Sequence, residues 1–312
     1  MSHPEAPRIN LWSRALRERF GGRVQRVALD AGMSCPNVDG TVTTGGCIFC
    51  DASGSRAPYA QPALSLRDQL ARGIERLGRR FGAERFIAYL QPRSNTHAPA
   101  ERLRAIFTEA LDHPQVVGLA LGTRADCLPD AVLDLLAEIN THRPVWLEVG
   151  LQSASDKTLR WMNRAHTVAQ WREAVDRAKA RGLFVATHLI LGLPTDTPAD
   201  GLRAMELLNH HGIDGVKFHM LCVDRHARLA SLHRLEPLRL LTREEYARAV
   251  CDRLERLSPD TQVMRLVSDC PADRLVAPTW LADKAATLRL IDQELVRRDT
   301  RQGSLLAKAT DR

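Results

Sequence analysis

The sequence predicts an α/β fold, an open partial (β/α)6 TIM-like barrel of parallel strands that carries a C-terminal α-rich extension. Short apolar runs alternate with longer stretches of helical periodicity, which is the pattern of parallel strands joined by crossover helices. The starts of successive strands also lie mostly near the roughly 30 residues that one βαβ unit occupies. Six such units suffice for a partial barrel.

The predicted strands are apolar runs, each followed by a loop and in most cases by a helix. They cover residues 24–29, 85–90, 116–121, 145–151, 183–191 and 215–220. A helix is expected over 129–139, where a proline start signal precedes a helical stripe formed by Val132, Leu133, Leu135, Leu136 and Ile139. A further helix is expected over 168–180.

The strand–helix alternation weakens beyond residue 225. We expect a helix over 242–257 with Glu245 at a capping-box position, a short strand over 263–267 and a last helix near 280–298. No low-complexity tract or clear linker interrupts the chain. The predicted organisation is therefore an N-terminal segment (1–23), a barrel core (24–225) and an extension (226–312) packed on the core.

Composition restricts the function classes. The chain of 312 residues has 44 Lys and Arg against 37 Asp and Glu, and this net charge of +7 permits a polyanionic partner without requiring one. Seven cysteines are too few for a disulfide scaffold, which indicates a reducing compartment. No stretch resembles a signal peptide or approaches the roughly 20 apolar residues of a membrane span. We expect a cytoplasmic protein without membrane contact.

Three cysteines, Cys35, Cys47 and Cys50, lie in the loop that follows the first predicted strand. Thiolates are the usual ligands of iron–sulfur clusters, and a four-iron cluster normally takes four of them. With three local thiols, one iron stays open to a substrate or cofactor. The loop also falls at the carboxyl end of a barrel strand, where the active sites of such folds lie.

Two other uses of these thiols are open. A structural zinc ion would take the three thiols plus a histidine or the distant Cys270, although no second C-x-x-C motif supplies a usual spacing. A redox-active Cys47/Cys50 pair is the third interpretation. The remaining cysteines, Cys127, Cys222, Cys251 and Cys270, are expected to behave as small buried apolar residues.

The cysteine loop, with GMSCPNVDG, GGCIFC and an aromatic residue before its last cysteine, resembles the radical S-adenosylmethionine (SAM) superfamily. Most members have the spacing C-x3-C-x2-C, whereas eleven residues separate the first two cysteines here, and this longer loop is similar to the YhcC/YtqA-type branch and more distantly to elongator-type enzymes. The resemblance continues in order through YLQPRSNTHAP, ALGTRADCLPD, LEVGLQSASDKTL, MNRAHT, HLILGLPTDT and VKFHML.

The resemblance implies an enzyme with a [4Fe-4S] cluster on Cys35, Cys47 and Cys50, whose open iron binds the methionine part of SAM. One-electron reduction, by a donor such as flavodoxin or ferredoxin, would then yield a 5′-deoxyadenosyl radical that abstracts hydrogen from the substrate. The protein's part is to position both reactants and exclude water.

The resemblance also implies six cofactor-binding residues: Gln91, Glu148, Gln152, Arg164, His188 and Gly192. Arg164 would pair with the SAM carboxylate. Gln152 and His188 would lie near the ribose, and Gly192 would bring the backbone close to the adenine. Alternatives stay open: Gln91 as the mere end of a strand, Arg164 as a surface arginine and His188 as a core histidine. Glu148 lies in an apolar strand and requires a partner.

Four further residues are candidates for substrate contact: Asn95, Arg124, Lys217 and His219. Asn95 can instead cap a helix, and Arg124 can instead pair with Asp126. Lys217 and His219 alternate on one face of the sixth strand, which is either the barrel interior or the solvent side.

The resemblance implies the reaction class more firmly than the substrate. Related enzymes modify tRNA, and carbon 5 of the wobble uridine is the first candidate site. Arg225, Arg228, Arg239, Arg243, Arg297 and Arg298 offer phosphate contacts or are simply solvated. Aromatic residues make up only 5% of the chain, which argues against extensive base stacking. A small metabolite or porphyrin-like substrate is the second hypothesis, and a zinc- or cluster-stabilised RNA-binding protein without catalysis is the third.

Overall fold

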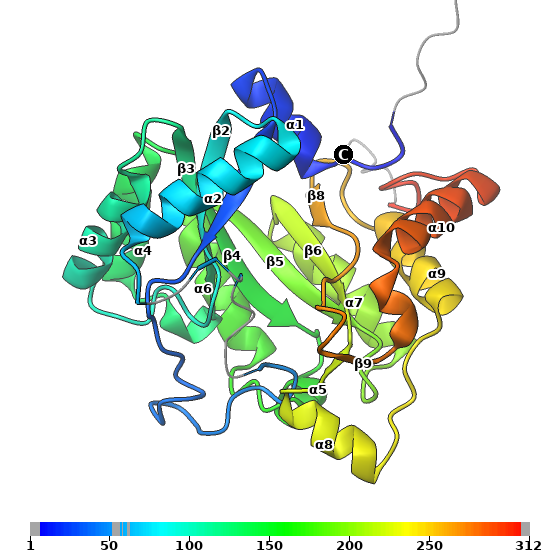
Figure 1. The fold of residues 1–312 in the computed structure, drawn as a ribbon. Helices are drawn as coiled ribbons and strands as arrows, with labels where there is room; N and C mark the ends of the chain where they lie inside the picture. Colours follow the sequence, from blue (N-terminus) through cyan, green and yellow to red (C-terminus); the bar gives the residue numbers. More distant parts are fainter. Residues whose placement is uncertain (1–6, 52–56, 58, 61–62, 307–312) are drawn as a thin grey trace, which may run out of the picture.

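Seven parallel strands form one sheet in the computed structural model, which describes residues 7–51, 57, 59–60 and 63–306 (Figure 1). The strand order is β1-β2-β3-β4-β5-β6-β8. The bounds are β1 Val24–Leu29, β2 Arg85–Leu90, β3 Val116–Thr123, β4 Val145–Gln152, β5 Phe184–Leu191, β6 Gly215–Met220 and β8 Gln262–Arg265. All six predicted strands are confirmed to within two residues at each end.

The strand predicted at 263–267 is β8, and it extends the sheet. It pairs in parallel with β6, so the sheet has one strand more than the six predicted units. Only four residues long, β8 is too short for its sequence to indicate which strand it joins. The proposed boundary after residue 225 therefore divides the chain but not the sheet.

The helices alternate with the strands of the barrel, as predicted. Their bounds are α1 Trp12–Phe20, α2 Leu66–Phe81, α3 Ala100–Leu111, α4 Asp130–Asn140, α5 Asp156–Trp161, α6 Val168–Ala180, α7 Pro198–His210, α8 Arg228–Leu235, α9 Arg243–Leu254 and α10 Lys284–Arg297. The predicted capping box is present in α9, where Thr242 and Glu245 each accept the other's backbone N–H. The last helix begins at Lys284 rather than near residue 280, because Asp283 caps it after a short 3-10 turn, Thr279–Ala282.

The two faces of the sheet bury different side chains. In β4, Val145, Leu147, Val149 and Leu151 pack outward in the main core beneath the helices. The alternate residues Trp146, Glu148, Gly150 and Gln152 therefore face the barrel interior. This period of two decides which side chains can meet inside the barrel.

Helix α1 packs against the inner face of the sheet. Trp12 and Leu16 are buried against Ile87, Tyr89 and Trp146, and the Trp12 and Trp146 rings meet edge to face with centroids 5.8 Å apart. These contacts lie in the N-terminal halves of the strands for Ile87 and Trp146. The apolar filling therefore leaves the carboxyl ends of the strands for polar groups.

The C-terminal extension packs on the barrel in two places. Helices α9 and α10 bury Tyr246, Val250 and Ile291 in the main core. Strands β7 (Val223–Asp224) and β9 (Leu275–Ala277) form a small antiparallel sheet. Figure 1 shows α8 beside α5 and the cysteine loop at the carboxyl ends of the strands. In the part of the chain that the structure describes, no helix has the length and apolar character to cross a membrane.

Candidate active site at the carboxyl ends of the strands

Two asparagines hold the cysteine loop against the segment between α5 and α6. The Asn37 amide donates to the backbone carbonyls of Asn163 and Arg164 at 2.6 and 3.0 Å. The Asn163 amide donates in return to the carbonyls of Thr44 and Gly46 at 3.1 and 2.8 Å. The loop is thereby fixed by hydrogen bonds on both sides of its glycine turn.

Cys47 is the most buried of the three loop cysteines. Its Sγ lies 3.6 Å from Asn37 Nδ2 and 3.7 Å from Arg164 Nη1, and both groups donate to it. The same guanidinium donates to the carbonyl of Gly150 at 3.0 Å. Donors aimed at a thiolate are the contacts that stabilise and tune an iron–sulfur cluster. Arg164 therefore joins Cys47 to the end of β4 and is not a free surface arginine.

The thiols of the loop lie close enough to influence one another. Desolvation raises the pKa of the Cys50 thiol to about 12, and Cys47, Asp51 and Cys35 add to the increase. Three thiols carried by one loop and close enough to influence one another are the donor set that an iron–sulfur cluster takes.

The described residues do not assemble a site for a single zinc ion. Within residues 7–51, 57, 59–60 and 63–306, no three His, Cys, Asp or Glu side chains converge on a site for one metal ion. Cys270, the fourth ligand of the zinc hypothesis, lies beside Cys222, and its Sγ is 3.9 Å from Asp224 Oδ2. A cluster of four irons is larger than one ion, and each thiolate can bind a separate iron.

Below the cysteine loop, Glu148 is the centre of a buried polar layer inside the barrel. Its Oε2 accepts hydrogen bonds from Tyr89 Oη at 2.7 Å, from His188 Nε2 at 2.9 Å and from Lys217 Nζ. Arg26 Nη1 lies 3.6 Å from the other carboxylate oxygen. The structure thus supplies the partner that Glu148 requires, and Lys217 faces the barrel interior.

Charge in this layer is set by burial and by the neighbours. Burial alone would raise the pKa of Glu148, but Lys217 and His188 outweigh it and hold the pKa well below its usual range. Burial lowers the pKa of His188 to about 4. The layer therefore contains an ionised Glu148 and a neutral His188 at neutral pH.

The half-buried His188 makes stability depend on pH. Its pKa of about 4 in the folded protein is below the 6.5 of an unfolded histidine, so the unfolded chain takes up the proton first as the pH falls. This contribution is complete above pH 6.5 and is lost towards pH 4. We expect His188 to remove about 2 kcal/mol of unfolding free energy between pH 7 and pH 5. In His188→Gln, which keeps a hydrogen-bond donor for Glu148, the free energy of unfolding should change less between pH 7 and pH 5, as measured by urea unfolding of the apoprotein. The same change as in the wild type would contradict this assignment.

His219 lies in the same layer, two residues closer to the carboxyl end of β6 than Lys217. Its ring is 5.2 Å from that of His188, centroid to centroid. Its Nε2 is buried without a hydrogen-bond partner among the residues that the structure describes. A buried polar atom of this kind requires a partner, which a bound ligand can supply.

Gly150 provides room for two polar side chains at the end of β4. A methyl group on it would lie 2.3 Å from Gln152 Nε2 and 2.7 Å from Arg164 Nη2. Gln152 itself has a positive φ of 73°, an uncommon conformation for a side chain with a Cβ. The close packing therefore fixes Gln152 and Arg164 relative to each other.

Replacing Gly150 with alanine is expected to displace both side chains. The two atoms are the far ends of long side chains that can move, so we expect a loss of unfolding free energy of only about 1 kcal/mol, together with weaker SAM binding because Arg164 moves. Gly78→Ala in α2 is the matched control: its methyl makes only ordinary contact, 3.5 Å from the Ala83 carbonyl, and it favours the helix. Urea unfolding and SAM equilibrium dialysis measure both effects. Equal behaviour of the two variants would show that Gly150 has no packing role.

Asn95 and Arg124, expected on an accessible rim, are buried, with 1% and 2% of their surface exposed. The Asn95 amide donates to the carbonyls of Leu90, Pro92 and Gly122, and so joins the ends of β2 and β3. Arg124 forms a fork with Asp126 at 2.8 and 2.7 Å, the alternative left open by the sequence. Asn95 Oδ1 and Arg124 Nη1 each lack a hydrogen-bond partner among the described residues. Their substrate contact stays a prediction.

Gln91 and Gly192 lie at the carboxyl edge of the sheet. The Gln91 backbone N–H donates to the Leu29 carbonyl at 3.4 Å, which joins the ends of β1 and β2. Gly192 has a φ of 83°, and a Cβ there would lie 3.0 Å from the Leu241 side chain. The turn therefore requires glycine, and the approach of its backbone to adenine stays a prediction.

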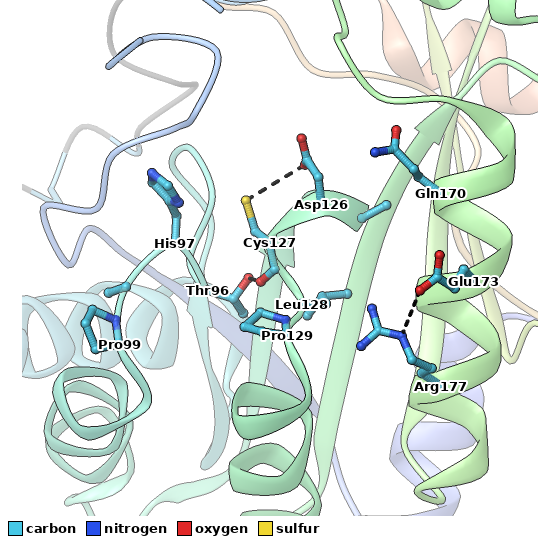
Figure 2. Close-up of a pocket in the computed structure, with 12 residues that line it drawn as sticks. Thr96, His97, Pro99, Asp126, Cys127, Leu128, Pro129, Gln170, Glu173 and Arg177 are labelled. Atoms are coloured by element: carbon cyan, nitrogen blue, oxygen red, sulfur yellow. Dashed lines mark hydrogen bonds and ion pairs between the residues drawn. The ribbon is translucent and has the colours of Figure 1, made fainter. Parts of the chain in front are cut away.

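A cavity of about 660 Å³ lies next to this edge, outside the barrel interior (Figure 2). Figure 2 shows Gln170, Glu173 and Arg177 of α6 on one side, His97 on the other, and Asp126 and Cys127 between them. None of the predicted cofactor-binding residues lines it. We therefore place the candidate site inside the barrel rather than in this cavity.

Four residues of the site were not predicted from the sequence: Arg26, Asn37, Tyr89 and Asn163. The period of two along β1 and β2 was a usable signal for Arg26 and Tyr89, because it places both on the inner face. Asn37 and Asn163 gave no such signal, since their contacts join loops 126 residues apart in the chain.

Comparison with known proteins identifies the family. Residues 40–223 match the Radical SAM superfamily, and residues 213–297 match the Radical_SAM C-terminal domain. The protein YtqA of Bacillus subtilis is 36% identical over 293 residues, which cover 94% of this chain and 91% of that protein. Protein YhcC of Escherichia coli is 36% identical over 301 residues, 96% of each chain.

Two more distant proteins share part of the chain or its fold. A tRNA-2-methylthio-N(6)-dimethylallyladenosine synthase of Acidithiobacillus ferrooxidans is 31% identical over 183 residues, 55% of this chain and 38% of that enzyme. The solved structure of an N-terminally truncated Elp3 from Methanocaldococcus infernus has a TM-score of 0.67 at 16% identity, and it covers 89% of this chain and 64% of that one. This last likeness shows the fold.

The superfamily match spans more than half of the sequence, and the two bacterial relatives align along nearly all of it. The chain therefore belongs to the radical SAM superfamily and is an enzyme whose cofactors are a [4Fe-4S] cluster and SAM.

Proposed function

We propose that this enzyme modifies a base in tRNA through hydrogen abstraction, with the side chain at carbon 5 of the wobble uridine as the first candidate. The radical chemistry of this proposal is supported by the link from Cys47 through Arg164 to Gly150, and its tRNA part is carried by the basic surface beside the cysteine loop. When bound, the cluster and SAM supply a carbon-centred radical.

The chain's own residues hold and orient the reactants. Cys35, Cys47 and Cys50 would bind three irons, and Arg164, already beside Cys47, would pair with the SAM carboxylate. His219 Nε2, which has no hydrogen-bond partner among the described residues, can bond to whatever enters the barrel from the carboxyl side. The apolar packing of α1 excludes water from the opposite end.

Two observations support RNA as the substrate. The relative from Acidithiobacillus ferrooxidans is named for a tRNA modification. Arg225, Arg228, Arg234 and Arg239 are exposed on or near α8, and the Arg228 guanidinium lies against Gly45 of the cysteine loop. A basic surface beside the site can bind phosphates without sequence preference.

The proposal also includes a flavodoxin or ferredoxin as electron donor and a cytoplasmic location. A reducing compartment suits a chain whose seven cysteines form no disulfide.

Charge reversal at α8 tests the RNA part. The triple variant Arg225→Glu, Arg228→Glu, Arg234→Glu should weaken tRNA binding and reduce the salt dependence of log K by about 1 for each phosphate that is no longer bound. The matched control, Arg76→Glu, Arg79→Glu, Arg80→Glu on α2, changes net charge equally and should bind as the wild type does. Salt titrations of tRNA binding measure both.

Comparing tRNA nucleosides from cells with and without the protein tests the reaction. We expect one modified nucleoside to disappear or its precursor to accumulate. An unchanged profile would contradict the tRNA proposal and favour a small-molecule substrate of the same enzyme class.

A further inference from the structure

Arg274 of the C-terminal extension forms an ion bridge with the residue that follows Cys50. Its Nη2 donates to Asp51 Oδ2 and, at 2.5 Å, to Asp224 Oδ2. Asp51 is the neighbour of Cys50 in the chain, and Asp224 belongs to β7. One guanidinium thus ties the cysteine loop to the small β7–β9 sheet.

A second set of contacts holds the same turn from its other side. The Leu229 backbone N–H, at the start of α8, donates to the Ile48 carbonyl at 2.8 Å. Ile48 packs in a separate apolar cluster with Val223, Leu229 and Ala230. The Cys47–Cys50 turn is therefore enclosed by residues that lie more than 170 positions further along the chain.

The bridge is partly buried, so the two carboxylates require the positive charge of Arg274 between them. Side-chain exposure is 4% for Asp51, 12% for Asp224 and 19% for Arg274. The two carboxylates repel each other once the guanidinium between them is removed, and burial strengthens this repulsion. Asp51 would then move towards solvent, and the Cys50 backbone would move with it.

We propose that Arg274 is a positioning residue for the cluster: through Asp51 it holds Cys50 in place and slows cluster loss. The inference rests on the assignment of Cys50 as a cluster ligand, which is part of the proposed function. It gives the extension a role in cofactor retention that the sequence of the cysteine loop does not show.

The test compares Arg274→Gln with a matched control, Arg298→Gln. Arg298 also lies in the extension, also bridges several carboxylates (Asp252, Glu255 and Glu294) and is 18% exposed, but it joins α9 to the end of α10, away from the cysteine loop. Each protein is reconstituted with iron and sulfide without oxygen. The iron retained after gel filtration and the rate of loss of the cluster's visible absorbance under a ferrous chelator are then measured.

We expect Arg274→Gln to lose its cluster roughly tenfold faster than the wild type, because removing a group that orients a metal ligand typically weakens metal binding by about tenfold or more. Arg274→Lys, which keeps the charge, should fall between the two, and Arg298→Gln should match the wild type. If Arg274→Gln does not fold, Asp51→Asn removes the carboxylate through which Arg274 holds the cysteine loop and should still accelerate cluster loss.

Equal rates for Arg274→Gln and Arg298→Gln would overturn the inference. Retention of full iron by Cys50→Ala would instead overturn the cysteine assignment, so the two failures are distinguishable.

Discussion

Replacing Cys50 with alanine should leave a folded protein that retains no [4Fe-4S] cluster after anaerobic reconstitution. The same result is expected for Cys35→Ala and Cys47→Ala, because three thiolates are the protein ligands available in this loop and loss of one leaves a second iron without a protein ligand. Iron and sulfide analysis with the visible absorption spectrum measures the effect.

Cys251→Ala is the control for the cysteine variants. Cys251 is buried in α9, where its thiol donates to the Ile291 carbonyl at 3.6 Å, and it should be dispensable for the cluster. A cluster that survives in any of the three loop variants at the wild-type level would contradict the ligand assignment.

The largest loss of stability is expected from Lys217→Met. Lys217 and Glu148 are almost fully buried, with side-chain exposures of 1% and 0%, and the variant leaves the Glu148 carboxylate without its ammonium partner. Removing one member of a buried pair typically lowers the free energy of unfolding by about 3–5 kcal/mol. Urea unfolding of the apoprotein at pH 7 measures it.

Two further variants make this result specific. The double variant Glu148→Gln, Lys217→Met should recover part of the loss, since it also removes the carboxylate charge that Lys217 no longer neutralises. Lys179→Met removes a more accessible partner of Asp214, with 30% of each side chain exposed, and should lower stability by only about 1 kcal/mol. A loss no larger for Lys217→Met than for Lys179→Met would show that the polar layer does not stabilise the barrel.

Much of the barrel could be predicted because local pattern and tertiary structure agree. The apolar runs that become β1 to β6 are buried on their outer face, so each run is visible in the sequence. The need of Glu148 for a partner was also visible, since a lone acid in a buried strand is unfavourable. Which residue supplies the partner was not, because Lys217 is 69 positions away.

The rest of the site depends on contacts between distant loops. The Arg274–Asp51 bridge spans 223 positions, and neither residue lies in a periodic element that would indicate its direction. Asn95 and Arg124 follow strands, and polar residues at such positions predict an accessible rim. In the structure, however, Asn95 bonds to neighbouring backbone carbonyls and Arg124 bonds to Asp126. A polar side chain in a loop can orient the loop as readily as a ligand.

The most direct test of the central claim is the formation of 5′-deoxyadenosine from SAM by the reconstituted wild-type protein. The protein is incubated without oxygen with SAM and dithionite, or with reduced flavodoxin, and the products are separated by chromatography. We predict 5′-deoxyadenosine and methionine in the wild type and neither above background in the Cys35→Ala, Cys47→Ala, Cys50→Ala triple variant. A wild-type protein with a full cluster that binds SAM and never cleaves it would contradict this claim.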